Sequence, residues 1–121
     1  IADCDYIVRK TIASRLPEGR LFRLIRDPDL EVRQIVANRI PTVSLGLLAY
    51  DDAPEIRRIV AERISAADAV MLLKDSDWVV RYIAAQKVEP AETLKILLND
   101  PEPDVRSVVQ QRLSSSQPTE D

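Results

Sequence analysis

The chain has 121 residues, a length that suits one domain, and it is 45% hydrophobic but only 4% aromatic, so its core has to be built from Ile, Leu, Val and Ala. A single cysteine excludes an internal disulfide and a site of four thiolates, and a net charge of −3 gives no overall attraction to nucleic acid. Histidine is absent, which removes the commonest general base and metal ligand, and we predict that the protein is not an enzyme.

Aspartate recurs along the chain at a nearly constant interval. The five residues stand 24 positions apart, or 25 at the last step: Asp3, Asp27, Asp51, Asp75 and Asp100. Such self-similarity is the signature of a tandem array in which each repeat packs on its neighbours. We predict a single repeat domain over residues 1–113, composed of repeats 3–26, 27–50, 51–74, 75–99 and the half repeat 100–113.

The first part of each repeat has the pattern of an α-helix, with the recurring aspartate counted as position 1. Aliphatic residues at positions 6, 9 and 10, such as Val32, Ile35 and Val36, have the i, i+3, i+4 spacing of one helical face. Alanine at position 11, replaced by Gln110 in the last repeat, predicts close helix contact and an exposed end. The aspartate at position 1 predicts the N-cap. A proline near position 15, such as Pro41, ends the helix after about ten residues.

The second part of each repeat predicts a shorter helix. Leucines three positions apart, such as Leu45 and Leu48, follow the proline within a segment of about eight residues, and one or two turns of 3-10 helix bury i and i+3 on one side. Neither helix buries its apolar face alone, so we predict an all-α fold, a right-handed α-solenoid or superhelix of about five stacked repeats. The polar segment 114–121 lacks periodicity and is predicted to be disordered.

Arginine occupies position 7 in every repeat. This position lies at the border of the apolar face, where the side chain can reach an aspartate or a loop carbonyl of a neighbouring repeat. The alternative is a basic strip that grips a partner's carboxylates or phosphates, which the equal number of aspartates argues against. We therefore predict a structural ladder formed by Asp3, Asp27, Asp51, Asp75 and Asp100 with Arg9, Arg33, Arg57, Arg81 and Arg106.

A second basic column lies at position 13. Here a cation meets the partly negative end of the helix and can bond to its free carbonyls, so capping is the default interpretation. If either column binds a partner, position 13 is the better candidate, because no acid stands at a fixed offset from it. The candidate partner-binding strip is Arg15, Arg39, Arg63, Lys87 and Arg112.

The repeat has the form Asp, four residues, Val-Arg, two residues, Val-Ala, a proline break and Leu-x-x-Leu, with Val32-Arg33 and Val36-Ala37 as one example. Over residues 3–113 it resembles the leucine-rich repeat variant family, although HEAT-type repeats share the Asp and Val-Arg elements at longer periods. The resemblance implies α-helices alternating with 3-10 helices, without strands. It also implies an upstream cysteine-rich segment that holds a 4Fe-4S cluster, and an association with nitrogen-fixing bacteria.

No cofactor is predicted in this chain itself. Cys4 matches no cluster motif, so no ligand role is carried over and we expect a structural thiol. Ile1 and Ala2 fill the last two positions of a preceding repeat. We therefore expect the natural protein to continue upstream, into the domain that the resemblance implies.

The favoured function is a non-catalytic scaffold that binds another protein. We expect it in the cytoplasm and away from membranes, because no apolar run approaches the ~20 residues of a membrane span. One alternative is the repeat half of an iron–sulfur, redox-linked accessory protein, and a second is nucleic-acid binding through the position-13 strip, which the acidic composition disfavours. An enzyme that uses Asp51 and Asp52 is the weakest alternative, because capping explains Asp51.

Overall fold

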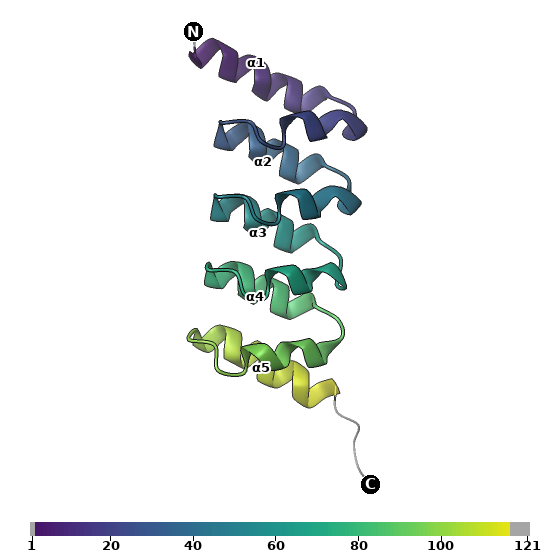
Figure 1. The fold of residues 1–121 in the computed structure, drawn as a ribbon, viewed down its shortest axis with the longest axis vertical. Helices are drawn as coiled ribbons and strands as arrows, with labels where there is room; N and C mark the ends of the chain where they lie inside the picture. Colours follow the sequence, from purple (N-terminus) through teal and green to yellow (C-terminus); the bar gives the residue numbers. More distant parts are fainter. Residues whose placement is uncertain (1, 117–121) are drawn as a thin grey trace. The chain divides into compact units, whose positions relative to one another are not determined.

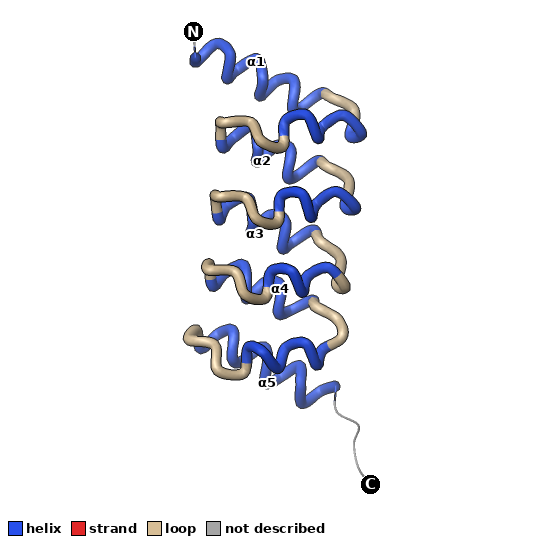
Figure 2. The backbone as a smooth tube through the Cα atoms, in the orientation of Figure 1, coloured by secondary structure: helices blue, strands red, loops and turns tan. Residues whose placement is uncertain are grey.

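The computed structural model describes the backbone of residues 2–116 and the side chains from residue 5 to residue 115. In this part of the chain α-helices alternate with shorter 3-10 helices, and there is no β-strand (Figure 2). The fold divides into two compact parts, which we call the N-terminal block (Ile1–Arg63) and the C-terminal block (Ile64–Asp121).

The N-terminal block stacks its α-helices in chain order. Helix α1 packs on α2 and α2 packs on α3, while the short helix η1 lies on α2 and η2 lies on α3 (Figure 1). The repeat therefore alternates one long and one short helix, as its two apolar spacings predict. The elements are α1 (Ala2–Arg15), η1 (Glu18–Leu24), α2 (Leu30–Arg39), η2 (Thr42–Leu48) and α3 (Pro54–Arg63).

The C-terminal block repeats this arrangement. Helix α4 packs on α5, with η3 against α4 and η4 against α5. The helix at the end of the chain is longer than α4. The elements are η3 (Asp68–Leu72), α4 (Trp78–Lys87), η4 (Ala91–Leu97) and α5 (Pro103–Ser116).

The core of each block is aliphatic, as the composition predicts. In the second repeat, Val32, Val36 and Ala37 of α2 are buried together with Leu45 and Leu48 of η2. Burying a Val or Leu side chain contributes roughly 1.5–3 kcal/mol, so these positions supply most of the stability. The corresponding buried residues of the fourth repeat are Val80, Ala84, Ala85, Leu94 and Leu97.

In the second to fifth repeats the α-helix begins at position 4, three residues later than predicted. In the second repeat it begins at Leu30, and its N-cap is Asp29, whose carboxylate accepts the backbone N–H of Glu31 at 2.9 Å. The prediction that position 1 caps the helix was therefore wrong. The carboxylate of Asp27 instead accepts the N–H of Asp29 at 2.9 Å, an Asx-type turn that competes with capping for short acidic side chains.

The end of the chain also differs from the prediction. We expected disorder from Ser114, but α5 continues through Ser116, so that boundary was placed too early; residues 117–121 lie outside the described residues. Gln110 is exposed, as its polar side chain at position 11 predicts. Ile1 and the side chains of Asp3 and Cys4 lie outside the described part, and the predictions for them stay predictions.

Candidate interaction surface

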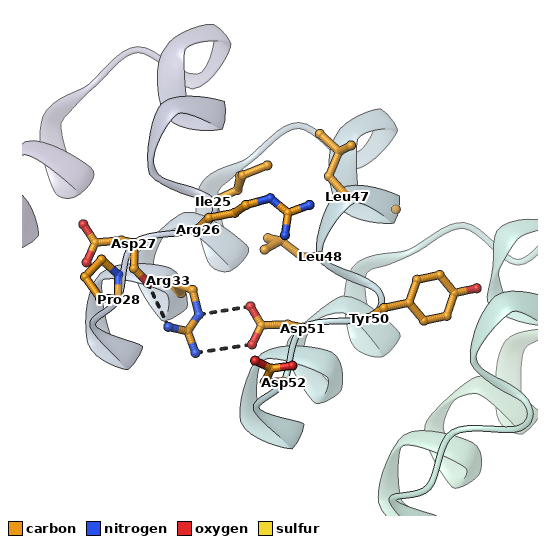
Figure 3. Close-up of a pocket in the computed structure, with 11 residues that line it drawn as sticks. Ile25, Arg26, Asp27, Pro28, Arg33, Leu47, Leu48, Tyr50, Asp51 and Asp52 are labelled. Atoms are coloured by element: carbon orange, nitrogen blue, oxygen red, sulfur yellow. Dashed lines mark hydrogen bonds and ion pairs between the residues drawn. The ribbon is translucent and has the colours of Figure 1, made fainter.

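The arginine at position 7 ties each repeat to the next one. In the N-terminal block, Arg33 Nε and Nη2 donate to the two carboxylate oxygens of Asp51 at 3.0 and 3.3 Å, while Nη1 donates to the backbone oxygen of Asp27 at 2.8 Å (Figure 3). Arg9 makes the corresponding ion pair with Asp27 at 2.7 Å. Such paired, charge-assisted bonds are short and directional. One guanidinium therefore links the turn that precedes its own α-helix to the turn that precedes the α-helix of the following repeat.

The same ladder is present in the C-terminal block. Arg81 donates to both oxygens of Asp100 at 2.7 and 3.1 Å, and the exposed fractions of the two side chains are only 12% and 3%. Burial raises the pKa of the Asp100 carboxyl, but hydrogen bonds from Arg81 and from the N–H of Glu102, with the charges of Arg81 and Arg106, lower the pKa more. The net effect is a pKa below the ordinary value, which favours the charged form of Asp100.

The cations at position 13 bind the end of the preceding helix. Arg39 donates to the carbonyl of Ala13 at 2.7 Å and Arg63 to that of Ala37 at 2.7 Å. In the C-terminal block Lys87 donates to the carbonyl of Ile64 at 2.9 Å. Positive charge at this end of a helix is favourable because the last carbonyls lack intrahelical partners. The position-13 cation of one repeat thus caps the helix end of the repeat before it.

The two ends of the position-13 column differ. Arg112 donates to the carbonyl of Val88 at 2.7 Å and forms an ion pair with Glu89 at 3.0 Å. Arg15 is exposed, and within the described residues it has no hydrogen-bond partner. Four of the five predicted strip residues are therefore used inside the protein, and a partner-binding role for the strip stays a prediction.

The outward side of η1 carries a row of arginines. In a 3-10 helix residues three apart lie on the same side, and Arg20, Arg23 and Arg26 follow this spacing. Hydrogen bonds between residues three apart continue to the N–H of Asp27, so Arg26 keeps the register beyond the end of η1. All three side chains are exposed, and none has a hydrogen-bond or ion-pair partner among the described residues.

The outward side of η2 is apolar at two of these three positions, and Ser44 stands in the place of Arg20. Leu47 and Tyr50 take the places of Arg23 and Arg26, and their exposed fractions are 57% and 74%. Phe22 of η1 and Val43 of η2 are 54% and 94% exposed. We call this surface the short-helix face; it consists of Arg20, Phe22, Arg23, Arg26, Val43, Leu47 and Tyr50.

A groove of about 610 Å³ joins the two halves of the short-helix face. Arg26, Leu47 and Tyr50 line it together with Asp52 and the ladder pair Arg33 and Asp51. In Figure 3 the Arg26 side chain extends across the groove toward Leu47. The groove therefore places the free guanidinium of Arg26 beside the apolar side chains of Leu47 and Tyr50. In the C-terminal block, a hollow of about 530 Å³ lies over α4 and α5.

Asp51, one of the two carboxylates of the enzyme alternative, is bonded inside the protein. Asp51 accepts bonds from Arg33 and from the N–H of Ala53 at 2.9 Å, so both of its oxygens are already used. In the part of the chain that the structure describes, no three His, Cys, Asp or Glu side chains are grouped to hold a metal ion. Over the same residues, none of the helices is long and apolar enough to cross a membrane.

The prediction of candidate residues missed the arginine row. The two basic columns were found because they recur in every repeat, whereas Arg20, Arg23 and Arg26 occur in the first repeat only. Their spacing of three residues was the available signal. It is the period that identified the buried leucines of the short helices.

Comparisons with known proteins agree with this architecture. Residues 7–29 match the family model described as leucine rich repeat variant. The chain is also similar to a solved structure described as a leucine-rich repeat variant with a novel repetitive protein structural motif: the identity is 47%, the TM-score is 0.81, and the match covers 92% of this chain and 47% of that chain. This chain thus spans about half of that protein. No curated protein matches it. The likeness confirms the predicted all-α repeat fold, whereas its handedness stays a prediction.

Proposed function

Because the chain belongs to the leucine-rich repeat variant family, we propose that it is a non-catalytic repeat scaffold that binds another protein through its short-helix face. One observation carries the proposal: Phe22, Val43, Leu47 and Tyr50 are exposed, although the core beneath them is filled by other side chains. Single exposed apolar residues are ordinary, but several on one surface mark an interaction site.

The internal role of the two basic columns supports this choice of surface. The guanidinium groups of Arg33 and Arg81 are bonded to carboxylates, and those of Arg39 and Arg63 are bonded to helix-end carbonyls. A partner that contacted these columns would have to break bonds that hold consecutive repeats together. The short-helix face offers contacts without that cost.

Two double variants of the full chain test the proposal. Leu47→Ser with Tyr50→Ser removes apolar contacts from the short-helix face, and Ile96→Ser with Leu98→Ser is the matched control on exposed residues near η4. We expect a partner purified with the parent protein from its own cell to be lost from the first variant and retained by the second. Similar melting temperatures would show that both variants fold. A partner retained by the first variant contradicts the proposal.

The iron–sulfur alternative concerns the predicted upstream segment and stays a prediction. Iron content and visible absorbance of the full-length protein, purified without oxygen, test it directly. A colourless and iron-free product contradicts it and leaves the scaffold proposal in place.

A further inference from the structure

The two blocks differ in charge. Residues 1–63 contain eleven Lys and Arg against ten Asp and Glu, whereas residues 64–121 contain six against ten. In the N-terminal block the ladder and the helix caps use the arginines of positions 7 and 13, apart from the exposed Arg15. The positive charge that remains available gathers on η1, whose only acidic residue is Glu18.

The spacing of this charge matches that of a polypeptide. A 3-10 helix rises about 2.0 Å per residue, so Arg20, Arg23 and Arg26 follow one another at steps of about 6 Å. Alternate residues of an extended strand are about 6.6 Å apart, and residues four apart on an α-helix are about 6 Å apart. An acidic segment in either conformation can therefore bring one carboxylate to each guanidinium.

The apolar half of the face lies beside this row. Leu47 and Tyr50 line the same groove as Arg26, so a segment that follows the arginines also reaches exposed apolar surface. Arg and Tyr are the residue types that concentrate binding energy in protein interfaces, and the planar guanidinium pairs with carboxylates in a forked geometry.

We infer that the short-helix face binds an acidic protein segment, whose carboxylates pair with Arg20, Arg23 and Arg26 while its apolar side chains contact Leu47 and Tyr50. This inference rests on the proposed function and adds the chemistry of the partner to it. Complementary charge selects the partner and sets its register, while the apolar contacts hold it in place.

A protein fits this surface better than a nucleic acid. Glu18 beside the row and Asp52 at the groove oppose a continuous phosphate backbone, and the block as a whole is almost neutral. The aliphatic side chains of Val43 and Leu47 offer no flat surface for a base. Phe22 and Tyr50 do have aromatic faces, so an oligonucleotide is one arm of the test.

The test uses the full chain and defined probes in fluorescence anisotropy. Two labelled peptides carry Glu at every second or every fourth position next to Leu, a third has Lys in place of Glu, and a single-stranded oligonucleotide has the charge of the acidic peptides. We expect one acidic peptide to bind at least about tenfold more tightly than the Lys peptide and the oligonucleotide, and to weaken with added salt. Equal binding of the Lys peptide, or tighter binding of the oligonucleotide, overturns the inference.

Charge reversal locates the site. Arg23→Glu with Arg26→Glu should weaken the acidic peptide at least about tenfold, while Lys74→Glu with Lys95→Glu, which changes the net charge equally, should leave its Kd within about twofold. Peptide-induced shifts of amide NMR signals should concentrate in residues 18–26 and 42–50. Equal weakening by both variants, or shifts elsewhere, overturns the inference.

The natural partner separates this inference from the proposed function. If the partner is lost from the Leu47 and Tyr50 variant but still binds the Arg23 and Arg26 variant, the scaffold proposal is supported. The inference that the partner segment is acidic is then contradicted. If the partner binds both variants normally, the proposed surface falls as well. Loss from both variants supports the inference.

Discussion

The short helices of the two blocks agree on their inward side and differ on their outward side. The inward residue at position 19, or 20 in the longer fourth repeat, is buried in all four: Leu21, Leu45, Ala69 and Leu94. The outward residues at positions 21 and 24, or 22 and 25 in the fourth repeat, have no common character: Arg23 with Arg26, Leu47 with Tyr50, Met71 with Lys74, and Ile96 with Asn99. Inward residues have to fill the space between repeats at interior packing density, whereas outward residues are free to vary. Function is therefore to be sought where the repeats differ.

Two leucines of η2 give the sharpest version of this comparison. Leu45 is buried and Leu47 is 57% exposed, so truncation of the first leaves a cavity and truncation of the second does not. We expect Leu45→Ala to lower the free energy of unfolding by about 2–5 kcal/mol, and Leu47→Ala by less than about 0.5 kcal/mol. Urea unfolding followed by helical circular dichroism measures both. Comparable losses would break the distinction between the two sides.

The ladder extends the comparison to the inward polar contacts. Asp100→Ala removes the acceptor of Arg81 and the partner of the Glu102 N–H. We expect a loss of about 3 kcal/mol in the free energy of unfolding, because Arg81 keeps a largely buried charge without its partner. The control is Asp104→Ala, at an exposed acid in the first turn of α5. We expect it to lower the free energy of unfolding by less than about 1 kcal/mol. If Asp100→Ala lowers the free energy of unfolding no more than the control does, the ladder contributes no more to stability than an exposed surface contact.

The position-13 column offers a matched pair with a smaller effect. Arg39 donates to the carbonyl of Ala13, whereas Arg15 is exposed without such a bond among the described residues. We expect Arg39→Ala to cost about 1.5 kcal/mol, the range for a hydrogen bond to a charged group, and Arg15→Ala less than about 0.5 kcal/mol. Thermal unfolding of the two variants side by side decides this. Equal costs would mean that helix-end capping contributes nothing.

Acid should weaken the ladder by a smaller, graded amount. The pKa of Asp100 lies below its ordinary value of 3.8 in the folded protein, so the unfolded chain takes up the proton first. The stabilisation is complete above the unfolded pKa and is lost as pH falls through the lower folded pKa. We expect the melting temperature to fall as the pH drops below the ordinary aspartate value of 3.8, and to fall less in Asp100→Asn. Identical profiles for parent and variant would exclude this contribution.

Much of the fold could be predicted because the same sequence pattern recurs in several repeats. The recurring aspartate, the aliphatic face and the proline break each appear in several repeats, so a chance match in one repeat is outweighed by the others. The pairing of position 7 with position 1 also followed from residue types, because an arginine at the edge of an apolar face needs a carboxylate within reach. The helix ends at Arg39 and Lys87 agree with the predicted stops.

Local competition explains what could not be predicted. Position 1 and position 3 are both aspartate in the first, second and fourth repeats, and either can cap a helix. Tertiary contact decides, because Arg9 draws Asp27 into the ladder and leaves Asp29 to cap α2. A single repeat contains no sign of this neighbour, so sequence spacing alone favours the wrong residue.

The short-helix face was missed for the opposite reason. Repetition reveals what every repeat needs, whereas a binding surface belongs to one or two repeats. No other short helix has basic residues at all three positions of Arg20, Arg23 and Arg26. At these positions only Lys74, in the place of Arg26, is basic. The three arginines stand out only once the chain is folded and the charges that serve the fold can be separated from those that do not.

The double duty of the position-1 aspartate limits how such a chain can change length. Asp51 fixes the turn of its own repeat and receives Arg33 from the one before, so removing residues 27–50 would bring Arg9 to Asp51 and recreate the same junction. Deleting twelve residues, which is half a repeat, would leave the position-7 arginine without a position-1 aspartate in register with it. The chain should therefore lengthen or shorten by whole repeats. A gene that duplicates or deletes one repeat keeps the arginine–aspartate contact between the repeats that become neighbours.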